Sequence, residues 1–165
     1  MRNLIKFVIV CWMMSTISGC LFWKHHSKND GSIVLQDYPM DKFKEVTNQE
    51  DKLILKDVNF DYNSSKLKPS FEKTLDGISK WISSNPDKTI HILSEGNCDE
   101  RGSNEYNMAL GEQRALAVRA YLVSKGIQAG RIQTVSYGEE KPLDPAHNET
   151  AWSKNRRVHF LTAND

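Results

Sequence analysis

The side chains best suited to binding a small charged molecule are one acid and one base, Asp99 and Arg114. Asp99 lies in a short charged loop between Gly96 and Gly102. Glycine tolerates backbone angles that other residues avoid, so two glycines around this loop predict a tight, specific turn. An acid in a loop that faces a basic residue suits a small zwitterion, because a guanidinium matches a carboxylate with two parallel hydrogen bonds.

A helix is expected to present the base. Asn107, Leu110 and Arg114 follow the i, i+3, i+7 spacing, which places all three on one face of a helix predicted from about residue 103 or 104 to residue 124. Gly126 follows in the position that helix C-termini favour. Ala115, Val118 and Leu122 are expected to form the core-facing part of this helix. The loop acid and the helix base could therefore face each other.

Strands and helices are predicted to alternate along the rest of the folded part. A first amphipathic helix is predicted from apolar residues at helical spacing, namely Leu67, Phe71, Leu75, Ile78 and Ile82. Strands are predicted over 53–60, 89–95, 132–136 and 157–161, and a long loop over 138–155. The order strand-helix-strand-helix-strand-strand predicts an α+β fold. We expect a four-stranded mixed sheet with two helices packed on one face.

The N-terminus has the pattern of a bacterial lipoprotein signal. Arg2 and Lys6 precede an apolar stretch, residues 7–14, that is too short to cross a bilayer alone. Residues 17–20, Ile-Ser-Gly-Cys, then resemble a lipobox, in which Cys20 is acylated after cleavage. The alternative is an ordinary secretory signal with a coincidental cysteine. Leu21, rather than Asp, indicates the outer membrane by the sorting habit of enterobacterial lipoproteins.

Three regions are expected. They are a signal peptide (1–19), a lipidated Cys20 with a flexible tether (20–50), and a folded domain (51–165). The tether prediction rests on a polar, turn-rich composition without sustained periodicity. His25 and His26 have no nearby Cys or carboxylate cluster, so they are interpreted as solvated linker rather than metal ligands. The formal net charge of +1 gives no electrostatic argument for nucleic acid as a partner.

The stretch around the acid and the base also resembles a known family. The runs that carry the resemblance are Asp99-Glu100-Arg101-Gly102, Glu105-Tyr106-Asn107, Leu110-Gly111-Glu112 and Arg114-Ala115, followed by residues 135–142 and 153–157. They resemble the OmpA C-terminal-like peptidoglycan-binding domains, and within that family the peptidoglycan-associated lipoproteins. The resemblance covers about residues 53–161. One departure is Asn97, which stands where the family usually has His.

The resemblance implies a ligand, the meso-diaminopimelate of the peptidoglycan stem peptide. Asp99 would pair with its ammonium group and Arg114 would hold its carboxylate. The other implied site residues are Phe60 and Asp61 at the rim, Arg101, Tyr106, Asn107 and Leu110 as lining, and Asn155 and Arg156 closing the pocket. Structural alternatives stay open. Asp99 could cap the following turn, and Arg114 could form a surface ion pair with Glu112 or Glu105.

An enzymatic interpretation is not favoured by the sequence. Cys98 lies beside Asp99, but His91, His147 and His159 have no spacing that argues for a Cys-His nucleophile. No paired ligand spacing indicates a metal, and no cofactor is expected. Adjacent carboxylates such as Glu139 and Glu140 tend to point apart in a loop, which makes them poor acid/base partners.

We therefore expect a lipid-anchored binding protein that ties the outer membrane to the cell wall from the periplasmic side. The resemblance further implies the periplasmic protein TolB as a partner, with a role in envelope integrity and cell division. The alternatives are another OmpA-like wall anchor without Tol partners, such as a motor stator, and a Cys-dependent wall hydrolase. Replacing Cys98 with Ser would separate the hydrolase from a binder.

Overall fold

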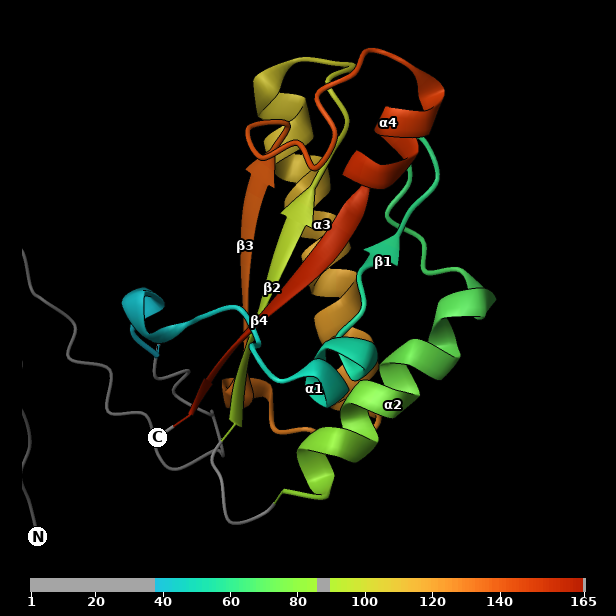
Figure 1. The fold of residues 1–165 in the computed structure, drawn as a ribbon. Helices are drawn as coiled ribbons and strands as arrows, with labels where there is room; N and C mark the ends of the chain where they lie inside the picture. Colours follow the sequence, from blue (N-terminus) through green and yellow to red (C-terminus); the bar gives the residue numbers. More distant parts are fainter. Residues whose placement is uncertain (1–37, 86–89, 165) are drawn as a thin grey trace, which may run out of the picture. The chain divides into compact units, whose positions relative to one another are not determined.

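The computed structural model describes residues 38–85 and 90–164. The predicted signal peptide, Cys20 and the first part of the tether lie outside these residues. The strands are β1 (Val58–Asn59), β2 (Ile90–Asn97), β3 (Ile132–Gly138) and β4 (Arg157–Asn164). The helices are α1 (Gln49–Ile54), α2 (Glu72–Ser83), α3 (Asn104–Ser124) and α4 (Glu149–Asn155), with short 3₁₀ turns η1 (Met40–Lys42), η2 (Pro69–Phe71) and η3 (Ala129–Arg131) (Figure 1).

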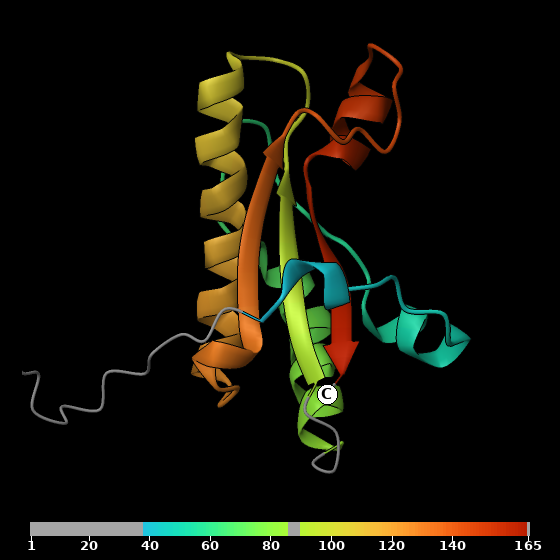
Figure 2. The same ribbon diagram turned by 90° about the vertical axis from the view of Figure 1, so that its left-hand side faces the viewer.

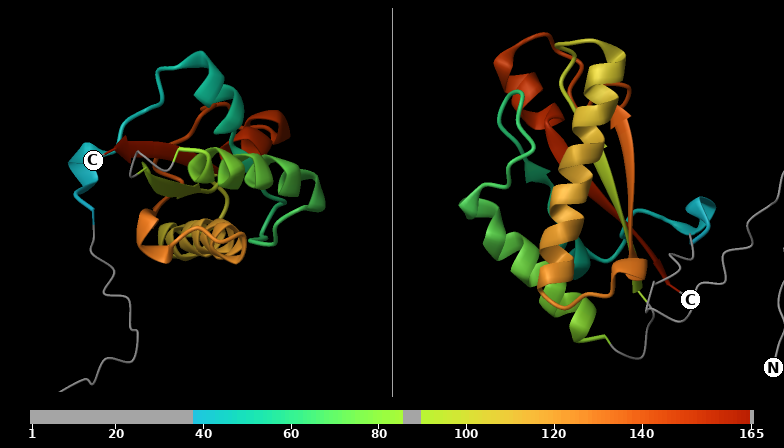
Figure 3. Two further views of the ribbon diagram at one scale, coloured as in Figure 1. Left: turned by 90° about the horizontal axis from the view of Figure 1, so that it is seen from below. Right: turned by 180° about the vertical axis from the view of Figure 1, so that it is seen from behind.

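The strands form one four-stranded sheet in the order β1-β4-β2-β3. β2 and β3 are parallel, with Ile92 opposite Ile132, and α3 forms the crossover between them. β4 is antiparallel to β1 and β2. Both α2 and α3 lie on the same face of the sheet (Figures 2 and 3). The predicted α+β fold with a mixed sheet and two helices on one face is confirmed.

The main core lies between the sheet and these two helices. Leu75, Ile78 and Ile82 of α2 are fully buried, as are Val118 and Leu122 of α3. They pack with sheet residues that include Val58, Ile90, Ile92, Val158 and Phe160. The helical spacing in the sequence therefore identified the buried faces of both helices correctly. No helix of the described part of the chain is long and apolar enough to cross a membrane.

Residues 38–48, which the sequence placed in the flexible tether, pack against the other face of the sheet. Phe43 is buried and lies in a small cluster with Leu93 and Ala163. The backbone of Lys44 exchanges two hydrogen bonds with Thr162 of β4, at 2.9 and 3.1 Å. These contacts join residues that are far apart in the sequence, so they could not be predicted from the composition of the segment. The described part of the predicted tether therefore belongs with the folded domain.

Residues 53–60 do not form the single strand that their apolar pattern predicted. Leu53 and Ile54 end α1, and β1 contains only Val58 and Asn59. Asn48 caps α1, because its side-chain oxygen accepts a hydrogen bond from the backbone N–H of Glu50 at 2.9 Å. The helix is held in place by Trp81 of α2, whose Nε1 donates to Asp51 at 2.8 Å. A helix stabilised by a local cap and one tertiary hydrogen bond therefore occupies the first part of the expected strand.

A second departure lies in the stretch 138–155, which was predicted as a loop. Its last seven residues form α4, and Asn148 caps this helix by accepting a hydrogen bond from Ala151 N at 3.0 Å. The helix has a single buried apolar residue, Ala151, so it lacks the hydrophobic periodicity that identifies longer helices. α4 matters for the site because Glu149, Trp152 and Arg156 lie on it or directly after it.

β2 and α3 approach each other so closely that two glycines are required. A Cβ atom on Gly96 would lie 1.9 Å from the carbonyl oxygen of Gly111, and one on Gly111 would lie 2.3 Å from Ser136 Oγ. Real Cβ atoms do not come this near to backbone, so any side chain here forces the helix away from the sheet. Gly96 thus serves close packing inside β2, and the turn after β2 uses Gly102, with φ of +127°.

We expect Gly96→Ala to lower the free energy of unfolding by about 3 kcal/mol, at the upper end of the cost of overpacking a core. Gly77→Ala is the matched control, because a Cβ there meets nothing within 4 Å and Gly77 lies inside α2. This control should be stabilised by about 0.5–1 kcal/mol. Urea denaturation measures both variants. Equal stability of Gly96→Ala and the unchanged chain would contradict the packing argument.

His159 on β4 is expected to make stability depend on pH. Its Nδ1 lies 2.7 Å from Asp57 Oδ1 and its Nε2 lies 2.8 Å from Glu45 Oε1. The hydrogen bond to Asp57, opposed by burial and assisted by Glu45, raises the pKa of His159 from 6.5 to about 9. Because the folded pKa is the higher one, this stabilisation is complete below pH 6.5 and is lost as the pH rises through 9.

The loss should be on the order of 2 kcal/mol between these two pH values. Chemical denaturation of the unchanged chain and of His159→Gln, over a pH series from 6 to about 10, measures it. The glutamine variant keeps a polar side chain without the titrating charge, so its stability should change less over this range. Parallel pH profiles of the two proteins would contradict the assignment to His159.

Candidate functional site

A pocket of about 260 Å³ lies where the end of β2, the loop after β1 and the start of α3 meet. Six predicted site residues line it together, namely Asp99, Arg101, Tyr106, Asn107, Leu110 and Arg114. The other lining residues are Tyr62, Asn63, Cys98 and Gly102. The structure thus brings the loop acid and the helix base into one pocket, although they come from different elements.

Short local interactions hold the loop that carries Asp99. Cys98 N donates to Gly138 O at 2.7 Å, which extends the pairing of β2 with β3 by one residue. Ser103 then caps α3, because its hydroxyl accepts a hydrogen bond from Tyr106 N at 3.2 Å. With positive φ at Gly102, the chain turns from strand to helix within a few residues. The predicted tight turn is confirmed at this position.

The Asp99 carboxylate is buried and already bonded to two arginines. Oδ1 accepts from the backbone N–H and Nε of Arg101 at 3.1 and 3.2 Å. Oδ2 accepts from Arg101 Nη2 at 2.8 Å and from Arg156 Nη1 at 3.0 Å. Burial alone raises the pKa of Asp99, but the hydrogen bonds from Arg101 and Arg156 outweigh burial and leave the pKa below its usual range. Asp99 is therefore ionised, and it caps its own turn as well.

Arg114 is almost fully buried, with 1% of its surface exposed. Its partners are the carbonyl oxygens of Ser64 (2.9 Å), Asn97 (2.8 Å) and Asp61 (3.2 Å), together with Cys98 Sγ (3.2 Å). Among residues 38–85 and 90–164, no carboxylate forms an ion pair with Arg114. The predicted alternative, a surface pair with Glu105 or Glu112, is wrong, since Arg114 points inward and Glu112 accepts from Thr134 instead.

This arrangement leaves Arg114 ready for an anion. A guanidinium has five N–H donors, and four of those on Arg114 are used in the contacts above. Burial lowers the pKa of Arg114, but arginine stays charged in proteins. A buried cation that is bonded only to neutral groups is stabilised strongly when a carboxylate or another anion binds beside it. Since Arg114 lines the pocket, such an anion could reach it there.

The remaining predicted site residues take different places. Phe60 is buried in the core under Arg114, with its ring centre 5.4 Å from the guanidinium carbon, and does not line the pocket. The Asp61 carboxylate points to solvent and pairs with Lys68 at 2.6 Å, so Asp61 serves the site through its carbonyl. Arg156 reaches Asp99, as described above.

Asn155 and Asn97 have structural contacts outside the pocket. Asn155 Oδ1 accepts from the backbone N–H groups of Leu143 and Asp144, at 2.8 and 2.9 Å, and so holds the loop before α4. Asn97 is buried, its side chain donates to Glu95 O at 2.9 Å, and it is not among the residues that line the pocket. The departure from the family pattern at Asn97 therefore does not alter the lining itself.

Sequence reasoning missed the residues that approach from a distance. The rings of Tyr62 and Trp152 both contact Arg101, with ring centres 4.0 and 4.2 Å from its guanidinium carbon. Glu149 Oε1 accepts from Arg156 Nη2 at 2.7 Å. The one available signal was the cap at Asn148 followed by Glu149, which marks a helix start.

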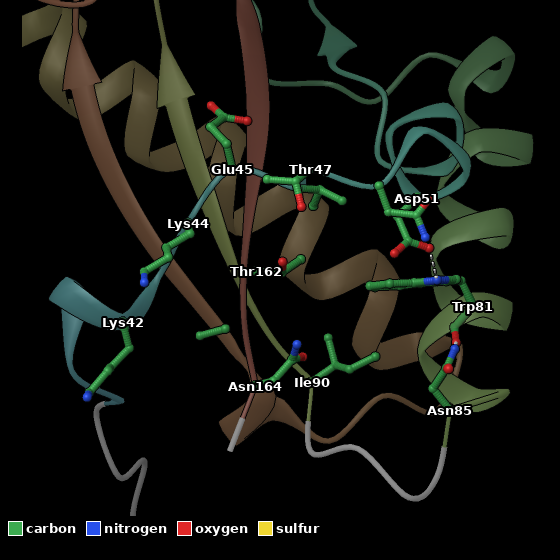
Figure 4. Close-up of a pocket in the computed structure, with 13 residues that line it drawn as sticks. Lys42, Lys44, Glu45, Thr47, Asp51, Trp81, Asn85, Ile90, Thr162 and Asn164 are labelled. Atoms are coloured by element: carbon green, nitrogen blue, oxygen red, sulfur yellow. Dashed lines mark hydrogen bonds between the residues drawn. The ribbon is translucent and has the colours of Figure 1, made fainter.

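A larger groove of about 570 Å³ lies elsewhere, between residues 42–51, the end of α2 and the end of β4 (Figure 4). Trp81 projects into it and is held by Asp51, while Lys42 and Lys44 line the other side. None of the predicted site residues lines this groove. The smaller pocket, with its buried cation, is therefore the better candidate for a specific site.

The structure offers no support for a Cys-His pair. Cys98 Sγ contacts Asn107 O and Arg114 Nη1, at 3.3 and 3.2 Å. His147 and His159 are bonded to carboxylates elsewhere. Within the described residues, no group of three or more His, Cys, Asp or Glu side chains is placed to hold a metal ion. Burial raises the pKa of Cys98 to about 11, with a partly opposing effect of Arg114.

We expect Cys98 to react slowly with thiol reagents in the folded protein. With its pKa raised from 9 to about 11, the thiolate fraction near neutral pH falls by about a hundredfold. Alkylation with iodoacetamide at pH 8, followed by mass spectrometry of the peptide that carries Cys98, measures this. The same chain in denaturant is the control. Equal labelling rates in both states would contradict a buried, protonated thiol.

The sequence matches the OmpA family over residues 59–156. A peptidoglycan-associated lipoprotein of Pasteurella multocida is 36% identical over 160 residues, which cover 96% of this chain and 97% of that protein. The one of Pseudomonas putida is 48% identical over 101 residues, or 61% of this chain and 59% of that protein. The match thus spans about three-fifths of the latter relative's length.

Solved structures of OmpA-like domains have the same fold as this chain. The crystal structure of the peptidoglycan-associated lipoprotein from Burkholderia pseudomallei has a TM-score of 0.61 at 39% identity, covering 64% of this chain and 88% of that one. The C-terminal domain of Helicobacter pylori MotB shares the fold, with a TM-score of 0.62 at 23% identity over 67% of this chain and 85% of that one. From its matched domain and its full-length relative, this chain belongs to the OmpA family, among the peptidoglycan-associated lipoproteins.

Proposed function

We propose that this chain is an outer-membrane lipoprotein that binds peptidoglycan non-covalently and ties the outer membrane to the cell wall. Its similarity to peptidoglycan-associated lipoproteins supports this function. The observation that carries the proposal is Arg114, a buried cation that lines a pocket and has no carboxylate partner among the described residues. A carboxylate of the stem peptide would supply that partner.

Diaminopimelate fits the chemistry of the pocket, since it carries amines and carboxylates on one short chain. Its carboxylate would take the remaining N–H of Arg114. Its ammonium group would approach Asp99, where it must share the carboxylate with Arg101 and Arg156 or replace one of their hydrogen bonds. Tyr106 and Leu110 would line the path of the carbon chain. Each charge-assisted hydrogen bond contributes about 1.5–3 kcal/mol before ordering costs are subtracted.

Anchoring would come from a lipid on Cys20, which lies outside the described residues. Each buried acyl CH₂ contributes about 0.8 kcal/mol, so several acyl chains hold a protein at the membrane. If the tether comprises residues 21–37, it spans at most roughly 60 Å. Single micromolar-range contacts with the wall then suffice, because many anchored copies face one polymer.

The proposed partner and the proposed cellular role rest on the similarity to related proteins. TolB as a partner, and a role of the Tol-Pal system in envelope integrity and cell division, follow from the peptidoglycan-associated lipoproteins and not from any contact in this chain. The protein would act as a binder and not as an enzyme, which agrees with the absence of a Cys-His pair in the described site. An OmpA-like wall anchor without Tol partners would use the same pocket.

The proposed function predicts that the full chain, in detergent, sediments with purified diaminopimelate-type peptidoglycan. Asp99→Ala and Arg114→Ala should weaken the affinity for the wall at least tenfold, a loss of about 1.4 kcal/mol or more. Asp76→Ala and Arg119→Ala are matched controls, because these residues bond to Tyr121 and to backbone carbonyls away from the pocket. Circular dichroism verifies that each variant is folded.

Three results would overturn parts of this proposal. If the unchanged chain stays in solution, peptidoglycan is not its ligand. If the two site variants sediment like the unchanged chain, the wall is recognised at another surface. If the controls lose binding as well, the effect is one of folding rather than of the pocket.

A further inference from the structure

Two aromatic rings lie within cation–π distance of Arg101. The centre of the Tyr62 ring lies 4.0 Å from the guanidinium carbon, and that of a Trp152 ring lies 4.2 Å from it. A flat guanidinium packs well on aromatic rings at such distances. Tyr62 comes from the loop after β1 and Trp152 from α4, so these contacts join two elements that are 90 positions apart in the sequence.

The edge of the same guanidinium is bonded to Asp99. Nε and Nη2 of Arg101 donate to the two carboxylate oxygens of Asp99, at 3.2 and 2.8 Å. Arg101 keeps 29% of its side chain exposed, and an exposed arginine of this kind ordinarily samples many rotamers. The two rings restrict the orientations open to Arg101 and favour the one in which its planar fork contacts Asp99.

Trp152 is itself held in a defined position. Its ring packs on Arg101, and its Nε1 also donates to Glu100 Oε1 at 2.8 Å, which adds to this packing. Arg156, the residue directly after α4, donates to Asp99 Oδ2 at 3.0 Å. The segment 149–156 therefore reaches the site acid twice, once directly through Arg156 and once through the Trp152 ring on Arg101. Trp152 is not among the residues that line the pocket.

We propose that Trp152 is a positioning residue for the peptidoglycan site, acting through Arg101 on Asp99. This inference rests on the proposed function. Trp152 holds the Arg101 fork on both oxygens of Asp99 and keeps Arg101 in the pocket wall. Without the ring, Arg101 swings into solvent, Asp99 keeps only Arg156 as its side-chain partner, and the wall opens. Affinity for the wall then falls although every residue that lines the pocket is unchanged.

The test compares the affinity of full-length chains, in detergent, for purified diaminopimelate-type peptidoglycan. Trp152→Ala should weaken binding about three- to thirtyfold, the range of a partly desolvated cation–π contact. Trp152→Phe keeps a ring over Arg101 and should stay within about twofold of the unchanged chain. Trp81→Phe is the matched control, because Trp81 bonds to Asp51 in a separate groove. It should leave affinity unchanged.

A double-mutant cycle separates positioning from general stability. Arg101→Lys removes the planar fork, so adding Trp152→Ala to Arg101→Lys should cause no further loss of affinity. A purely structural role of Trp152 would instead lower affinity by the same factor in both backgrounds. Thermal unfolding of each variant is recorded, and Trp152→Phe keeps the test valid if Trp152→Ala does not fold.

The outcomes are distinct. No binding by the unchanged chain overturns the proposed function, and with it this inference. Binding by the unchanged chain and equal binding by Trp152→Ala overturn the inference alone. If Trp152→Phe is as weak as Trp152→Ala, the hydrogen bond to Glu100 rather than the stacked ring is what matters, and the inference is wrong. Loss in Trp152→Ala, recovery in Trp152→Phe and no further loss in the Arg101→Lys background support it.

Discussion

The buried guanidinium of Arg114 is the interaction on which the site depends. A charge removed from water is costly unless its donors are satisfied, and here three backbone carbonyls and one thiol do so. The carbonyls belong to Asp61 and Ser64 in the loop after β1 and to Asn97 at the end of β2, while Arg114 itself is on α3. Three segments must therefore take their positions together before the charge is stabilised.

The close packing of α3 on the sheet sets where that charge lies. Gly96 and Gly111 let the helix backbone approach β2 more closely than any side chain would allow. Arg114 follows Gly111 by three positions, nearly one helical turn, so the same contact fixes the depth at which the guanidinium enters the domain. The rigid packing of α3 on the sheet thus places the Arg114 guanidinium beside the loops after β1 and β2, where it lines the pocket.

The arginines of the site serve two purposes. Arg101 and Arg156 neutralise Asp99, which keeps a buried acid ionised and oriented. Among the described residues Arg114 bonds only to neutral groups, so a carboxylate that entered the pocket would meet a buried cation without an acidic partner there. This division would suit the zwitterion of the proposed function, because the pocket offers both an acid and a base. A binder of this type, anchored in many copies, needs only modest affinity at each contact.

The sequence by itself determined what depends on local spacing. Helical periodicity identified the buried faces of α2 and α3, the Gly-bounded loop and the following helix suggested that Asp99 and Arg114 could face each other, and the family resemblance added Arg101. Tertiary structure alone decided that Phe60 lies under Arg114 rather than at the rim, and that residues 38–48 pack on the sheet. It also brought α4 to the site, where Trp152 and Arg156 reach residues more than 50 positions away. These contacts join residues far apart in the chain, and no local pattern specifies which distant partner a ring, a guanidinium or a backbone carbonyl will meet.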